Sequence, residues 1–206
     1  MADLNHSTLT DDKLHQPKGA STASLNQVLT SNGDGTTRFA DLPEEMFTVL
    51  DDISSESVVS QTLDTAGTEL QVAFGAAATS PNGSVSIATD GTITFLEDGV
   101  YYVNVRALAG RSVSTSTSTL GFSGRANGTQ VGSTVPITLD NAADGFNISV
   151  ADTSVVEVTA GTTYSYHMRL FDDGGGDNGI FFVDYATAGW NNTPSARISI
   201  RKIGLA

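Results

Sequence analysis

The stretch TITFLEDGVYYVNVRALAG, residues 92–110, contains the clearest structural pattern in the chain. Asp98-Gly99 is a turn signal that separates two apolar runs. After this turn, polar Asn104 and Arg106 alternate with apolar residues, so that one face of the segment is apolar and the other is polar. A period of two residues is typical of a β-strand with one buried face. The stretch therefore predicts two strands joined by a tight turn.

Similar patterns follow one another to the end of the chain. Turn signals such as Asn127-Gly128 separate them, and the final segment alternates again, with Ile198 and Ile200 on one face. Many short strands without a long helical pattern are typical of a β-sandwich or barrel. We therefore predict an all-β domain over residues 67–206.

One predicted strand, NGIFFVDY at residues 178–185, is apolar on both faces. A strand of this kind is covered on both sides. In a two-layer sandwich the second cover is either a neighbouring subunit or a loop folded over the outer face, and we favour the subunit. The predicted subunit interface consists of Ile180, Phe181, Phe182, Val183 and Tyr185.

The N-terminal part has a different character. Residues 14–39, LHQPKGASTASLNQVLTSNGDGTTRF, are polar and rich in Gly, Ser, Thr and Asn, with few apolar residues from which to build a core. The pairs Asn32-Gly33 and Asp34-Gly35 are turn signals. We interpret residues 1–41 as an extended arm with one or two tight turns.

Residues 42–66 read as a connector between this arm and the β-domain. Pro43 followed by two glutamates favours a short helix over residues 43–50, because proline suits the first helical turn and acids suit its positive end. A strand over residues 47–50 is the alternative.

The composition excludes several classes of function. The formal net charge of −13 argues against a nucleic-acid partner, because binding nucleic acid requires clustered Lys and Arg. The absence of cysteine excludes disulfides, thiolate zinc sites and a cysteine nucleophile. The first residues, MADLNHSTLTDD, lack the features of a signal peptide, and no apolar run has the length of a transmembrane helix. We therefore expect synthesis in a cytoplasm and no membrane partner.

No motif predicts an enzyme. The histidines His6, His15 and His167 are far apart in the sequence, and no nucleophile or metal-ligand spacing accompanies them. The nucleophile elbow and the phosphate-binding loop are both absent. We predict that the chain is not an enzyme.

The best metal candidate is the segment FDDGGGDNGIF, in which Asp172, Asp173 and Asp177 could offer carboxylates to calcium. Asp and Gly also simply form turns, and the spacing is not that of an EF-hand. We favour a plain loop over a calcium site and predict no cofactor.

Several segments of the β-domain together resemble one family. An early strand ends at residues 72–74, residues 93–102 lead from a strand through a glycine to two tyrosines, and residues 156–164 form a strand, a glycine turn and a strand. The last strand spans residues 198–203. This series is similar to the jelly-roll domain of the complement C1q and tumour-necrosis-factor type. The resemblance implies a C1q/TNF-like jelly-roll sandwich and a homotrimer, with residues 180–185 in the trimer interface.

The arm resembles a second family. It combines a histidine, a Pro-Lys-Gly-Ala core at residues 17–20, a short predicted strand at residues 27–29 and a glycine turn. This pattern is similar to the N-terminal segment of bacteriophage head-fibre and capsid-decoration proteins, in which a tryptophan follows the turn where Phe39 stands here. The resemblance implies a virion protein on the capsid surface whose arm binds the major capsid protein. The predicted capsid-binding residues are Leu14, His15, Pro17, Lys18, Gly19, Ala20, Val28 and Phe39.

Two other functions remain open at this point. The chain could be a tail-fibre or receptor-binding protein whose jelly-roll domain binds a host surface glycan. An exposed Trp190 would favour that function, and a buried Trp190 would count against it. A glycan-cleaving enzyme would need two carboxylates about 5–9 Å apart in a groove.

Overall fold

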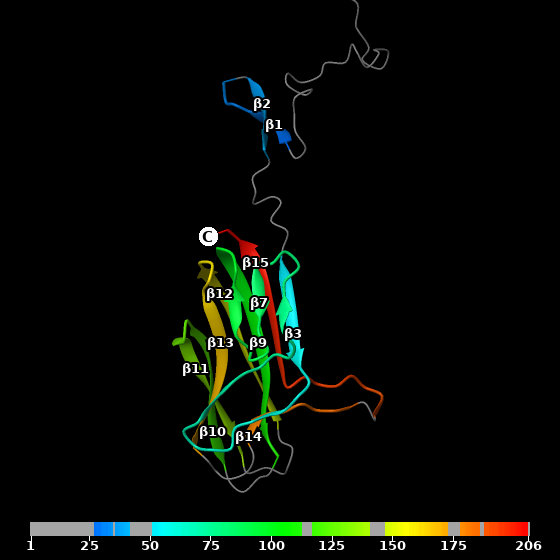
Figure 1. The fold of residues 1–206 in the computed structure, drawn as a ribbon, viewed down its shortest axis with the longest axis vertical. Helices are drawn as coiled ribbons and strands as arrows, with labels where there is room; N and C mark the ends of the chain where they lie inside the picture. The colour runs from blue at the N-terminus through cyan, green and yellow to red at the C-terminus, as the bar shows by residue number, and fades with distance from the viewer. Residues whose placement is uncertain are drawn as a thin grey trace, which may run out of the picture. The chain divides into compact units, whose positions relative to one another are not determined.

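The computed structural model describes residues 27–34, 36–41, 51–112, 117–140, 147–172, 178–185 and 188–205 (Figure 1). The chain divides into two compact units, residues 1–48 and residues 49–206. The predicted helix over residues 43–50 lies outside the described residues. No helix among the described residues is long and apolar enough to span a membrane.

The first unit contains a β-hairpin. Strands β1 (Gln27–Ser31) and β2 (Thr37–Asp41) pair antiparallel. In the turn, the backbone N–H of Asn32 donates to the carbonyl oxygen of Thr36 at 3.0 Å. The carboxylate of Asp34 accepts the backbone N–H and the hydroxyl of Thr36 at 2.9 and 2.6 Å. The predicted tight turn thus joins two strands, and short polar side chains satisfy its backbone.

The second unit consists of strands and connecting loops. Its strands are β3 (Asp52–Ser57), β4 (Gln61–Thr62), β5 (Glu69–Gln71), β6 (Ala78–Thr79), β7 (Val85–Ile87), β8 (Ile93–Phe95), β9 (Gly99–Arg111), β10 (Ser118–Ala126), β11 (Thr129–Leu139), β12 (Asn147–Val158), β13 (Thr163–Asp172), β14 (Asn178–Ile180) and β15 (Ala196–Gly204).

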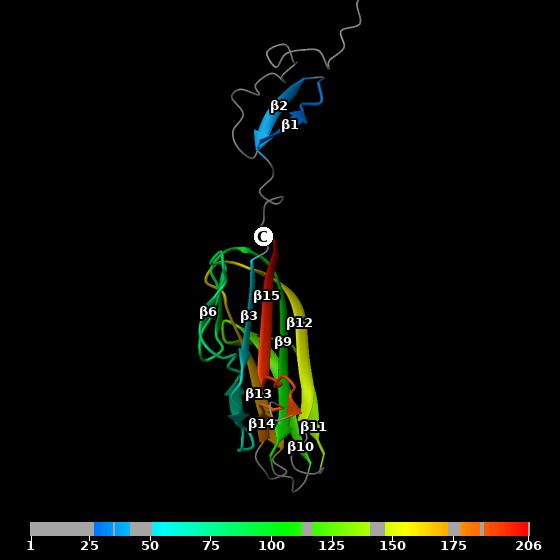
Figure 2. The ribbon, with the colours of Figure 1, turned by 90° about the vertical axis from the view of Figure 1, so that its right-hand side faces the viewer.

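These strands form two antiparallel sheets. One has the order β11-β10-β13-β8-β7-β6, with β5 also paired to β13. The other has the order β3-β15-β9-β14-β4, with β12 also paired to β9. Figure 2 shows β3, β15, β9 and β12 side by side in this second sheet. The principal strands are therefore ordered β3-β15-β9-β12 in one sheet and β8-β13-β10-β11 in the other. The first strand of the second unit, β3, pairs with the last strand, β15. This is jelly-roll topology, and it confirms the predicted all-β jelly-roll sandwich.

Alternate residues of the two sheets fill the core between them. The period-two face predicted for β9 is buried, with Tyr101, Val103 and Val105 at most 1% exposed. From the other sheet, Phe122 stacks on Tyr166 with ring centroids 5.7 Å apart. Successive side chains of a strand point to opposite faces of the sheet. The alternation of apolar and polar residues in the sequence therefore predicted the buried face correctly.

The predicted connector contributes to the sandwich, which is a correction to the expected domain boundary. Strand β3 pairs with β15, with Ile53 opposite Ile200. Both Ile53 and Leu63 are buried in the core. The sequence of β3, DISSES, carries a single large apolar residue because β3 is an edge strand whose other face is polar. That pattern is too weak to identify a strand without knowing its partner.

The doubly apolar strand predicted over residues 178–185 is shorter in the structure. Strand β14 ends at Ile180, which is fully buried within its own chain and therefore not available to a second subunit. Phe181, Phe182 and Val183 are half-buried, and Tyr185 is 47% exposed. The apolar run begins in the sheet and then leaves it as a surface loop.

Candidate functional site

The clearest candidate site is the loop that follows β14, residues 181–195, which we call the aromatic loop. Figure 1 shows this segment, in orange, projecting from the side of the sandwich. Backbone hydrogen bonds at its two ends fix its position in the fold. The backbone N–H of Phe181 donates to the carbonyl of Leu108 at 2.9 Å, and that of Ser195 donates to the carbonyl of Ser57 at 2.9 Å. Both ends are therefore fixed to the sheet that contains β9 and β3.

The aromatic loop is also held together internally. Val183 and Thr193 exchange two backbone hydrogen bonds of 3.1 and 2.9 Å. The side-chain oxygen of Asn192 accepts the backbone N–H of Tyr185 at 2.8 Å. The carbonyl of Tyr185 accepts the N–H of Ala188 at 2.9 Å. These contacts cross-link the two sides of the loop, so its aromatic residues stand on an ordered support.

Two of the aromatic side chains of this loop are exposed at the surface. Trp190, the only tryptophan of the chain, is 77% exposed, and Tyr185 is 47% exposed. A shallow pocket is lined by Tyr185, Ala188, Trp190, Asn191 and Thr193. Its lining combines two aromatic rings with an amide and a hydroxyl group. An apolar surface pocket with a few polar groups is the usual form of a small-ligand site.

Exposed apolar residues continue at the base of the aromatic loop. Val58 and Val59, which connect β3 to β4, are 58% and 65% exposed. The hydroxyl of Ser195 donates to the carbonyl of Val59 at 2.7 Å, which places the two segments together. Sequence reasoning identified Trp190 as a discriminating residue but missed this valine pair, which no local pattern marks.

A second constellation lies on the sheet that contains β13, and we call it the serine–histidine cluster (Glu69, Arg125, Ser165 and His167). His167 Nδ1 is 2.6 Å from Glu69 Oε1, and His167 Nε2 is 2.8 Å from the Ser165 hydroxyl. Arg125 lies 2.5 Å from the other oxygen of Glu69. Because the carboxylate can only accept, the neutral ring carries its proton on Nδ1, and Nε2 accepts the Ser165 hydroxyl.

The serine–histidine cluster therefore has the order of a nucleophile, a base and an acid. Burial lowers the pKa of His167, Glu69 opposes this effect, and Arg125 adds to it, so that the ring is neutral near pH 7. Acyl transfer also requires donors for a developing oxyanion. Ser165 lies within β13 directly opposite Arg125 of β10, where backbone N–H groups serve sheet pairing. The contacts that the structure shows for the cluster join Glu69 of β5 to Arg125 of β10 and His167 of β13.

Sequence reasoning missed the serine–histidine cluster. Glu69 comes from β5, whereas the serine and the histidine come from β13, and only the pairing of those strands brings them together. The alternation of Ser165 and His167 on one strand face was visible in the sequence. Their acidic partner was not.

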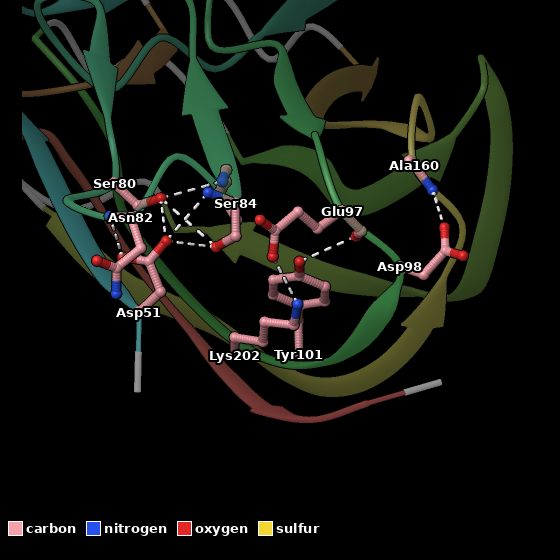
Figure 3. A network of polar contacts seen from close by, with 10 residues as sticks. Asp51, Ser80, Asn82, Ser84, Glu97, Asp98, Tyr101, Ala160 and Lys202 are labelled. Carbon is pink, nitrogen blue, oxygen red and sulfur yellow. Dashed lines mark hydrogen bonds and ion pairs between the residues drawn. The ribbon is translucent and has the colours of Figure 1, made fainter. Parts of the chain in front are cut away.

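A third polar group of residues closes the end of the sandwich at which the second unit begins, and we call it the Asp51 cluster (Asp51, Ser80, Asn82 and Ser84; Figure 3). Asp51 is only 2% exposed. Its carboxylate accepts the hydroxyls of Ser80 and Ser84, each at 2.5 Å. It also accepts the backbone N–H groups of Asn82 and Ser84 at 3.0 and 3.1 Å.

The electrostatics of Asp51 follow from these contacts. Burial works to raise the pKa of the carboxyl group, but the hydrogen bonds from Ser80, Ser84 and Asn82 outweigh it, and the pKa lies below its ordinary value. Beside the cluster, Lys202 donates to Glu97 at 2.7 Å, as Figure 3 also shows. A carboxylate that is buried and accepts four hydrogen bonds from its own chain is a structural tie.

The predicted capsid-binding residues are divided between described and other parts of the chain. Leu14, His15, Pro17, Lys18, Gly19 and Ala20 lie outside the described residues. Val28 and Phe39 lie in the β1-β2 hairpin, where Val28 pairs with Ala40 and Phe39 pairs with Leu29. Paired residues share a face, and adjacent pairs point in opposite directions. Val28 and Phe39 therefore lie on opposite faces and cannot enter one pocket together.

The candidate calcium ligands do not form a site among the described residues. Asp172 ends β13 and is exposed, whereas Asp173 and Asp177 lie outside the described residues. In the part of the chain that the structure describes, no three His, Asp or Glu side chains are grouped so that they could hold a metal ion.

The comparisons with known proteins concern the fold. No family model matches the sequence, and no curated protein matches it either. The globular domain of zebrafish complement 1qA protein is similar in structure, with 13% identity and a TM-score of 0.44 over 76% of this chain and 99% of that chain. Murine APRIL at pH 5.0 has 11% identity and a TM-score of 0.44 over 74% of this chain and 98% of that chain. The strand order described above, rather than these similarities, identifies the jelly roll.

Proposed function

We propose that this chain is a structural protein of a virus particle, displayed on the capsid surface as a homotrimer. Residues 1–41 attach to the major capsid protein, and the jelly-roll domain faces outward. The observation that carries the proposal is the division of the chain into two units. Among the described residues, the buried core of the second unit is formed by residues 53–200, and the proposal gives the arm a purpose other than folding.

The hairpin of the first unit supports an attachment role. Leu29 and Phe39 form a cross-strand apolar pair on one face of the hairpin. The hairpin has few apolar residues, and one of them, Leu29, is 43% exposed. A partly exposed apolar pair on a small hairpin, with Phe39 half-buried, is suited to docking against another surface. Three arms on one trimer would multiply a weak contact through effective concentration.

The test is particle binding by a variant that lacks residues 1–41. We expect the truncated chain to keep its fold by circular dichroism and to lose binding to undecorated particles. A full-length Leu29→Asp, Phe39→Asp double variant tests the hairpin face, with Lys18→Ala as a separate test of the Pro-Lys-Gly-Ala core. If the truncated chain still saturates the particles, the attachment site lies in the jelly-roll domain and the proposal is wrong.

The trimer is tested separately. The half-buried run Phe181 to Val183 is the surface that we propose for subunit contact. Phe181→Asp would place an unpaired charge in that contact, at a cost of several kcal/mol, and we expect it to produce monomers in light scattering. A monomeric wild-type chain at micromolar concentration would contradict the trimer.

A second candidate function is favoured by one observation. Trp190 is 77% exposed, which is the outcome that favours a receptor-binding domain. In that function the chain belongs to a tail fibre or a similar adhesive structure, and the jelly-roll domain binds a host surface glycan.

A further inference from the structure

We infer that the aromatic loop holds a binding site for an uncharged sugar, in which a pyranose ring stacks on Trp190 and Tyr185. The inference rests on the second candidate function above and specifies its site and its class of ligand. It starts from an energetic anomaly. Burying a large aromatic side chain usually stabilises a fold, yet Trp190, the only tryptophan of the chain, is 77% exposed.

The exposure of Trp190 is fixed by the loop rather than accidental. Its backbone N–H donates to the carbonyl of Tyr185 at 3.4 Å, and Gly189 before it has a φ of +75°, a conformation that glycine adopts without strain. The Val183–Thr193 bridge closes the loop below both aromatic residues. A ligand would therefore meet two aromatic residues on a backbone that is already cross-linked, which reduces the ordering entropy lost on binding.

The chemistry of the pocket selects the ligand. The two rings offer apolar faces, which match the C–H face of a pyranose. At the rim, the Asn191 amide and the Thr193 hydroxyl can donate and accept, which matches sugar hydroxyl groups. Amide and hydroxyl groups beside aromatic rings are adaptable polar contacts around rigid apolar ones.

The charge around the pocket argues for a neutral ligand. Residues 178–196 contain no Lys or Arg and a single acid, Asp184. The chain carries a net charge of −13, so the long-range field repels anions. Phosphorylated or acidic polymers have no cationic partner here, whereas an uncharged saccharide requires none.

The wild-type chain provides its own probe, because all tryptophan fluorescence comes from Trp190. We would titrate the full-length protein with maltohexaose, cellohexaose and N-acetylchitohexaose, and with hexagalacturonate as an acidic control. Stacking removes the ring from water, so we expect a saturable blue shift with at least one neutral sugar. The acidic control should bind at least about tenfold more weakly, because it lacks a cation to pair with.

Variants are then compared by calorimetry. We expect Trp190→Ala to weaken binding by at least about tenfold, as is usual for a central aromatic contact, and Tyr185→Ala to weaken it less. Phe171→Ala is the matched control, because Phe171 is a 53% exposed aromatic residue on the opposite sheet. It should bind like wild type.

Three results would overturn the inference. The first is the absence of a spectral shift with all three neutral sugars. The second is tighter binding of hexagalacturonate than of any neutral sugar. The third is dissociation of the trimer by Trp190→Ala in light scattering, which would make the loop a contact between copies of this chain. Particle binding by the same variants separates this inference from capsid attachment, since Trp190→Ala should leave particle occupancy unchanged.

Discussion

Charged side chains are usually exposed and large apolar side chains are usually buried, and the Asp51 cluster and the aromatic loop each depart from one half of this rule. The cluster buries a carboxylate that water would solvate well, and the loop exposes a tryptophan that a core would accept. The carboxylate is fully compensated by four hydrogen bonds within the chain. The tryptophan has no comparable compensation within the described residues.

This difference separates folding from function. A buried charge persists only where the fold satisfies it, so the Asp51 cluster reports a requirement of the folded state. An exposed aromatic residue adds little to folding, so its side chain is available for contact with a partner outside the chain. The comparison therefore predicts large stability effects at Asp51 and binding effects at Trp190.

The largest effect is expected for Asp51→Ala. The substitution leaves two buried hydroxyl groups and two backbone N–H groups without their acceptor, and we expect the free energy of unfolding to fall by roughly 3–5 kcal/mol. Urea unfolding followed by circular dichroism measures this. The neighbouring Asp52→Ala is the control, because Asp52 pairs with Arg201 on the surface, and such pairs contribute about 0–1 kcal/mol. Equal losses in the two variants would contradict the structural role of the cluster.

The same carboxylate predicts a pH effect in acid. Its pKa is lowered from 3.8 in the folded state, so the unfolded chain takes up a proton first as the pH falls. The stabilisation from Asp51 is therefore complete above about pH 4 and is lost as the pH falls further, through the folded pKa. Unfolding free energies from pH 6 to pH 3 should show this loss in wild type. In Asp51→Asn the curve should be flatter over the same range, and identical curves would contradict the prediction.

A smaller effect is expected from His167, which is buried only in part. Its pKa is lowered from 6.5, mainly by burial, so the unfolded chain binds the proton first. Stability should fall as the pH decreases below about 6.5, by at most about 1.4 kcal/mol per pH unit. His167→Gln keeps a polar partner for Ser165 and should remove this slope. An unchanged slope in the variant would show that other groups produce it.

The smallest stability effect is expected for Trp190→Ala. Because the side chain is mostly exposed, the free energy of unfolding should change by no more than about 0.5 kcal/mol. A loss above about 2 kcal/mol would show that the ring packs within its own chain, and would remove the contrast with Asp51. The measurement is the same urea titration, so Trp190→Ala can be compared directly with Asp51→Ala and Asp52→Ala.

Much of the fold could be predicted from the sequence because the period of a strand is a local property. The alternation in residues 92–110 identified β8 and β9 and the buried face of β9, and the turn at Asn32-Gly33 marked the hairpin of the first unit. Edge strand β3 was not predicted, because a single apolar residue, Ile53, cannot show an alternating pattern. The end of β14 was also misplaced, since an apolar run continues into the loop after Ile180.

The candidate sites depended more on tertiary structure. The sequence by itself determined that the chain is an acidic, cysteine-free β-sandwich with a separate polar arm, because composition and side-chain period need no partner. Only the folded structure decided that Glu69 meets His167, that Ser80 and Ser84 enclose Asp51, and that Trp190 faces solvent. Each of these depends on which distant strands pair and which loops remain uncovered. Such contacts join residues far apart in the chain, and no local pattern encodes them.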